Sequence, residues 1–148
     1  MKDPTHVLVQ ALYNELNGNV SYSGSTIPVY TRIVEWDDLV NSSTLFAAVI
    51  QLAGIRMTEI GPKDRYMVEG SGEIYVDTYF TGKDEGSQVP VNAISSSICQ
   101  LIDKEMTLSG YSHTVGRIQD LELLEYDLDD GGAMFRKTIT YQFIIEEL

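Results

Sequence analysis

The chain has 148 residues, which suits one domain with a single hydrophobic core spanning residues 1–148. Its 22 acidic and 10 basic residues give a formal net charge of −12, which disfavours a conventional nucleic-acid binder or a protein held on an anionic membrane surface. No apolar run approaches the roughly 20 residues that a membrane-spanning helix needs. The single cysteine excludes an internal disulfide bond.

Residues Thr5–Leu16 are predicted to form an amphipathic helix, because apolar side chains recur at helical spacing at Val7, Leu8 and Leu12. Asp3 or Thr5 can cap its first turn. The Asn-Gly-Asn sequence that follows ends the helix, since glycine and asparagine accept the left-handed backbone conformation.

A small hairpin is expected next, with arms at Val20–Tyr22 and Thr26–Tyr30. Pro28 has no N–H to donate, so the second arm is either an edge strand or very short. The stretch Arg32–Thr44 has weak periodicity and is expected to be a long connection. The first half of Leu45–Ile60 could be helical, but its pattern as a whole favours a strand, with Gly54 as a bulge or bend.

The clearest strand is Glu73–Thr81, and Tyr66–Val68 is expected to lead into it. Successive side chains of a strand point to opposite faces of the sheet. One face therefore holds Ile74, Val76, Thr78 and Phe80, and the other holds Tyr75, Asp77 and Tyr79.

The glycine-rich stretch Gly82–Gly86 is expected to cross over from this strand to a second helix at Ser87–Met106, with Pro90 in its first turn. Asp84 and Glu85 are expected to keep the loop soluble and to favour the start of the helix through its dipole. The apolar stripe of this helix consists of Val91, Ile94, Ile98, Leu101, Ile102 and Met106.

Two further strands are predicted at Val115–Tyr126 and Ala133–Glu146, joined by a hairpin loop at Asp127–Gly132. In the last strand, Phe135, Ile139, Tyr141, Phe143 and Ile145 alternate with Arg136, Thr138, Thr140 and Gln142. Lys137 interrupts the apolar set and is expected at a strand end outside the core. The order of elements indicates an α+β domain, a mostly antiparallel sheet with two helices packed on one face.

The sequence carries no catalytic, cofactor or metal signature. Asp127–Gly132 lacks the spacing of acidic ligands in an EF-hand loop and is better explained as a hairpin turn. Gly82–Gly86 has no phosphate-binding pattern, and its negative charge would repel phosphates. Neither His6 nor His113 has a Cys or His at zinc spacing, and Cys99 is expected to be a packing thiol. We therefore expect neither an enzyme nor a bound cofactor.

Trp36 lies in the polar stretch Glu-Trp-Asp-Asp together with Asp37 and Asp38. It either packs on its own core or anchors a partner, because tryptophan is a residue type that dominates interface energy. Three classes of protein stay open: an assembly subunit, a small enzyme with a diffuse site, and a ligand-binding or regulatory module. A ring-forming subunit would have a solution mass several-fold above the monomer.

The layout of the chain from about Thr5 to Glu146 resembles that of phage tail terminator (tail completion) proteins. The similarity lies in the opening helix HVLVQALYNELNG, the segment IPVY, the strand EIYVDTYF, the helix VNAISSSICQLI and the closing strand FRKTITYQFII. The resemblance implies a hexameric ring that caps the finished tail tube, stops its polymerisation and meets the head-side connector. It implies no enzymatic activity, no cofactor and no membrane, and a location in the tail or neck of a virion assembled in the host cytoplasm. Another neck or head–tail connector subunit is the alternative.

In such a ring DNA passes through the central channel without specific binding. Our hypothesis is that acidic side chains face this channel and keep the duplex from adhering, with Asp84, Glu85, Asp127, Asp129 and Asp130 as candidates. The alternative is that they are ordinary solvated surface acids.

Contacts with neighbouring proteins are expected from two places. Trp36, Asp37 and Asp38 are the candidates for docking on the tail tube. The polar side of the last strand, at Arg136, Thr140 and Gln142, would be available to neighbouring copies.

Overall fold

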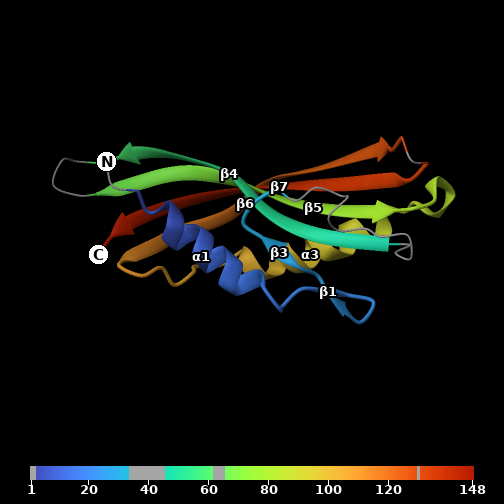
Figure 1. Cartoon of the computed structure of the whole chain (residues 1–148). Helices are drawn as coiled ribbons and strands as arrows, with labels where there is room; N and C mark the ends of the chain where they lie inside the picture. Colours follow the sequence, from blue (N-terminus) through green and yellow to red (C-terminus); the bar gives the residue numbers. More distant parts are fainter. Residues whose placement is uncertain (1–2, 34–45, 62–65, 130) are drawn as a thin grey trace.

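Four long strands make up most of a curled five-stranded sheet in the computed structural model, which describes residues 3–33, 46–61, 66–129 and 131–148 (Figure 1). They are β4 (Phe46–Ile60), β5 (Met67–Phe80), β6 (Tyr111–Asp127) and β7 (Ala133–Glu147), and the short β3 (Val29–Tyr30) lies at one edge. The strand order is β3-β4-β5-β7-β6, and only the β3–β4 pair is parallel. The predicted α+β fold is confirmed, including the choice of a strand after residue 45.

Two helices, α1 (Thr5–Leu16) and α3 (Val89–Ile102), cover the same face of this sheet (Figure 1). We call this the helix face and the opposite side the outer face. Most of both predicted stripes is buried, at Leu8, Leu12, Leu16, Val91, Ile94, Ile98 and Ile102, whereas Val7 and Leu101 are only half-buried. The second helix is shorter than predicted and ends at Ile102. Met106, which was predicted to lie in its last turn, comes after the helix and is also buried.

The early hairpin is smaller than predicted. Its strands are β1 (Ser21–Tyr22) and β2 (Ser25–Thr26), with Ser23 and Gly24 at positive φ in the turn. Residues 29–30 do not continue its second arm. They form β3, which runs parallel to β4, and the carbonyl of Pro28 accepts a hydrogen bond from Ile50 N at 3.0 Å. This edge position suits the proline, because proline has no N–H for a ladder.

Strand β5 begins at Met67, well before the predicted start at Glu73, and so it includes Gly70 and Gly72. Glycine usually weakens a strand, but here one of the two glycines permits a close approach. A Cβ at Gly70 would lie 2.2 Å from the carbonyl oxygen of Arg56, on the neighbouring strand. Ile74, Val76, Thr78 and Phe80 are buried as predicted, but Asp77 and Tyr79 of the opposite face are buried as well, so burial does not alternate at the end of the strand.

The hairpin of β6 and β7 is confirmed, and β6 starts at Tyr111, earlier than predicted. Its turn is closed by a hydrogen bond from Gly131 N to the carbonyl of Leu128, with Gly131 at φ 87°. On β7, the alternating set ending at Ile145 is buried as predicted.

The expectation for Lys137 is wrong. It lies opposite Val76 in the middle of the sheet, on the helix face, and its ammonium donates a hydrogen bond to Asn92 Oδ1 of α3 at 3.1 Å. A lysine can occupy such a position because its aliphatic stem packs in the apolar layer while its charged end reaches a polar partner.

Candidate interaction surfaces

The half of the outer face toward the β6–β7 turn holds a buried polar cluster centred on Asp77. Its carboxylate accepts hydrogen bonds from Arg136 Nε at 2.8 Å, Arg136 Nη2 at 2.9 Å and Gln51 Nε2 at 2.6 Å. The guanidinium of Arg136 also stacks over the ring of Tyr75, at 4.6 Å from its centre, and the Tyr75 hydroxyl donates to Glu73 Oε2 at 2.6 Å. The cluster thus links three neighbouring strands on the side of the sheet away from the helices.

Arg136 is predicted from the sequence to be available to neighbours, and in the fold it is held from within the subunit. It pairs in register with Asp77, whose side chain is only 2% exposed, while 27% of the Arg136 side chain stays exposed. The bidentate bond to Asp77 raises the pKa of Arg136, and the hydrogen bond to Glu73 raises the pKa of Tyr75. Only the outer edge of the guanidinium is therefore open to another protein.

Replacing Asp77 by alanine is expected to lower the free energy of unfolding by about 3 kcal/mol, because it leaves Gln51 and Arg136 without their shared acceptor. Equilibrium unfolding in urea measures the change. The control is the double variant Asp77→Ala with Arg136→Met, which removes the unpaired cation and should recover part of the loss. A loss below about 0.5 kcal/mol for the single variant, typical of surface positions, would contradict the buried cluster.

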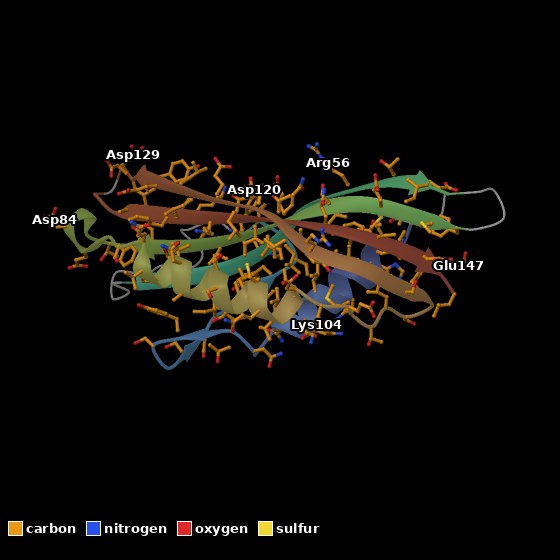
Figure 2. All side chains as sticks on the ribbon, turned by 180° about the vertical axis from the view of Figure 1, so that it is seen from behind. Arg56, Asp84, Lys104, Asp120, Asp129 and Glu147 are labelled. Carbon is orange, nitrogen blue, oxygen red and sulfur yellow. The ribbon has the colours of Figure 1, made fainter. Side chains whose placement is uncertain are left out.

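The other half of the outer face is hollowed. A cavity of about 530 Å³ opens there, and we call it the arginine hollow. Its polar lining comes from Arg56, Thr58, Glu69, Ser71, Arg117 and Gln142. Figure 2 shows Arg56 on the outer face, pointing away from the helices.

The floor of the arginine hollow is one row of residues across four strands. Arg56 of β4 pairs with Ser71 of β5, Ser71 pairs with Gln142 of β7, and Gln142 pairs with Arg117 of β6. Adjacent strands lie about 4.8 Å apart, so the backbones of the two arginines are separated by roughly 14 Å. Long side chains from both ends of the row can therefore close on one ligand group.

Irregular pairing places both arginines on this face. The β4–β5 register shifts between Ala53 and Arg56. The β6–β7 register shifts on both sides of Arg117, between His113 and Val115 and between Ile118 and Asp120. Without these shifts, strict alternation would turn Arg56 and Arg117 toward the helices. β-Bulges commonly re-aim a side chain in this way.

Both arginines are exposed, and neither makes an ion pair with any residue in the described ranges. The lining of the arginine hollow has two basic side chains and one acidic one, Glu69, on a strongly acidic protein. Glu73 and Asp120 lie on the same face in the next row, where both pair with Thr140. Gln142, predicted to face neighbours, lies exposed in the floor of the hollow, and Thr140 of the same face is half-buried.

Acidic side chains gather at the end of the sheet where β5 and β6 finish. Asp84 and Glu85 lie in the 3₁₀ turn η1 (Lys83–Glu85), and Asp127 and Asp129 lie at the β6–β7 turn. All of them are exposed, and we call Asp84, Glu85, Asp127 and Asp129 the acidic end.

The sheet register brings the two loops of the acidic end together. Phe80 at the end of β5 pairs with Ala133, and Ala133 pairs with Asp127. Figure 2 shows Asp84 and Asp129 at one end of the molecule and Glu147 at the other. The sequence predicts these acids as one channel-facing set, and the fold places those that it describes near one another. Asp130 and the proposed docking residues Trp36, Asp37 and Asp38 lie outside the described residues.

Asp84 and Glu85 do not support the start of α3. The first turn of α3 contains no acidic residue, because η1 ends at Glu85 and the helix begins only at Val89. The dipole acts mainly within the first turn, so this expectation is wrong. The loop instead folds on itself, with Glu85 N donating to the carbonyl of Gly82 at 3.1 Å.

No group of acidic, histidine or cysteine side chains that could hold a metal ion occurs in the part of the chain that the structure describes. Cys99 is half-buried on α3, and burial raises the pKa of its thiol. A raised pKa leaves less of the reactive thiolate, in line with a packing role. Among the described helices, none has the length and apolar character needed to cross a bilayer.

The fold and its surfaces define a class: an α+β subunit with helices on one face, and with a buried polar cluster and a hollow lined by exposed arginines on the other. A chain of a solved structure described as "Virion of native gene transfer agent (GTA) particle" has a similar fold, with a TM-score of 0.67 over 99% of this chain and 99% of that chain, at 12% identity. At this identity the similarity shows the fold alone. Comparisons with protein-family models and with curated proteins give no match.

The arginine hollow is not predictable from the sequence. Arg56 and Arg117 are far apart in the chain, and the register shifts that turn them outward leave little trace in the hydrophobic pattern. Gly54, at φ 63° beside the first shift, was predicted as a bulge or bend, and it is the one signal that pointed toward this region.

Proposed function

We propose that this chain is a structural subunit of a phage-like particle, which acts by contact with copies of itself and with neighbouring particle proteins. The observation that carries the proposal is the fold similarity to a chain of a gene transfer agent virion, because it extends over 99% of both chains. The charged outer face and acidic end suit a protein that works through its surfaces.

More specifically, we propose that the chain forms a hexameric ring that caps the tail tube, ends tube polymerisation and joins the tail to the head-side connector. The support is the resemblance to tail terminator proteins in the order of elements, together with the observed fold. In such a ring the acidic end would line the channel, where like charges repel the phosphates of passing DNA. The second candidate is another neck or head–tail connector subunit, which the same fold similarity supports.

Removal of the chain from the cell that makes the particle tests this function. Loss of a tail terminator leaves tubes of irregular, excessive length without heads, whereas loss of a connector subunit leaves tails of normal length unattached to heads. Electron microscopy of the released particles separates the two outcomes, and re-expression of the chain should restore normal particles. Normal particles without the chain would overturn the proposal.

The ring itself is tested on the purified protein. Negative-stain images should show annular particles, and the solution mass should be a multiple of the 16.5 kDa monomer. A protein that stays monomeric at every concentration would contradict the ring.

A further inference from the structure

We propose that the acidic end of one copy binds in the arginine hollow of a second copy, so that the subunits join head to tail. This inference rests on the proposed function for the expectation that copies of the chain meet in one assembly.

The arginine hollow is built to receive an anionic group. Arg56 and Arg117 stand at the two ends of one cross-strand row, and a register shift turns each of them to the same side. Arginine is well suited to interfaces with carboxylates, because its planar guanidinium forms two parallel hydrogen bonds with them. Two exposed guanidinium groups over a polar floor therefore favour a partner that carries several carboxylates.

The acidic end is the matching surface on the same chain. It presents carboxylates on two neighbouring loops, and neither Asp84 nor Asp129 forms an ion pair within the described ranges. Each copy carries a net charge of −12, so copies repel one another at long range. Copies can therefore associate only where a local attraction offsets this repulsion, and the arginine hollow and the acidic end supply one.

A subunit cannot fill its own arginine hollow. The hollow lies at Ser71 of β5, whereas the acidic end lies beyond Phe80 of the same strand. Nine residues of extended chain separate them by roughly 30 Å. The contact must therefore join different copies, and a contact between two unlike surfaces repeats from copy to copy until a ring closes.

Charge reversal with mixing tests the contact. One variant carries Arg56→Glu and Arg117→Glu, and the other carries Asp84→Lys and Asp129→Lys. Sedimentation velocity or native mass spectrometry measures the self-association of each. Each variant alone should associate at least about tenfold more weakly than the wild type, because like charges now face each other.

Mixing the two variants should restore assembly. The reversed hollow of the first variant then meets the reversed end of the second, and the remaining two surfaces are those of the wild type. Simple misfolding of either variant would not be repaired in this way. Circular dichroism should be unchanged, because all four positions are exposed.

A control variant reverses a charge elsewhere. Glu105→Lys lies on an exposed position beside the helices, outside both patches, and should leave association unchanged. Association of the wild type should also weaken as salt is raised, since salt screens exposed charges.

Several outcomes would overturn the inference. These are variants that assemble like the wild type, a mixture that does not recover, and a wild type that remains monomeric at every concentration. If the hollow variant assembles normally but fails to enter particles, the occupant is an acidic protein other than a second copy. The particle assay decides the proposed function independently, so the two can fail separately.

Discussion

Replacing Gly70 by alanine is expected to lower the free energy of unfolding by about 3 kcal/mol or more, at the upper end of the cost of overpacking. The added Cβ would lie 2.2 Å from the carbonyl oxygen of Arg56 and 2.7 Å from Phe143 Cζ. The first contact is with the backbone of a paired strand, which a side-chain rotation cannot relieve. Equilibrium unfolding in urea measures the change.

Gly72 offers the matched control, because it lies two residues along β5 on the same face. A Cβ there would meet only Ile55 Cγ1, at 3.4 Å, which is ordinary contact. Gly72→Ala should therefore change stability by less than about 1 kcal/mol, since alanine is the better residue in a strand. Equal effects of the two substitutions would show that the close approach at Gly70 is absent. Reducing the neighbouring ring with Phe143→Leu should not rescue Gly70→Ala, since the clash with Arg56 would remain.

Replacing Phe143 by alanine is expected to cost about 3–5 kcal/mol of stability, as for other buried aromatic side chains. Phe143 is 2% exposed, lies opposite Gly70 and stacks on Tyr141 with 6.2 Å between ring centres. Its ring fills the space that the missing side chain of Gly70 leaves, so truncation would open a cavity between sheet and helices. The midpoint and slope of urea unfolding give the measurement.

The neighbouring Gln142 provides the control, because it points to the opposite face and is exposed. Gln142→Ala should stay within about 0.5 kcal/mol of the wild type. If Phe143→Ala had no effect and Gln142→Ala had a large one, the faces of β7 would be assigned the wrong way round.

Much of the fold is predictable because hydrophobic periodicity is a local property. The 3.6-residue spacing in residues 5–16 and the alternation in residues 133–146 each report burial on one side of one element. Both are confirmed, as are the strand after residue 45 and the helix that starts near Pro90. The boundaries of β5 and β6 are less accurate, because the glycines in or before them usually signal a break.

Predictions from the sequence are wrong where distant parts of the chain meet. The sequence around Lys137 predicts a strand end, and only the position of Asn92 on α3 explains how a lysine fits on the helix face. Residues 29–30 look like a hairpin arm, but their partner is Ile50 and its neighbour on β4. In both cases a contact between residues far apart in sequence overrides the local pattern.

At the two arginines of the hollow, pairing between strands likewise overrides the local pattern. Alternation predicts that they face the helices, and a bulge on each strand reverses this. Asp77 is assigned to the correct face by alternation, but its burial with Arg136 depends on packing between strands. The acidic residues of the two loops are visible in the sequence, whereas their gathering at one end depends on the sheet register.

The amino-acid sequence by itself determined which segments are helix and strand, which side of each is apolar, and the acidic character of the surface, since these depend on neighbours in the chain. The tertiary structure alone decided the strand order, the bulges that turn Arg56 and Arg117 outward, and the close approach at Gly70. These features depend on hydrogen-bond register between strands, and shifting that register by one residue moves every side chain to the other face.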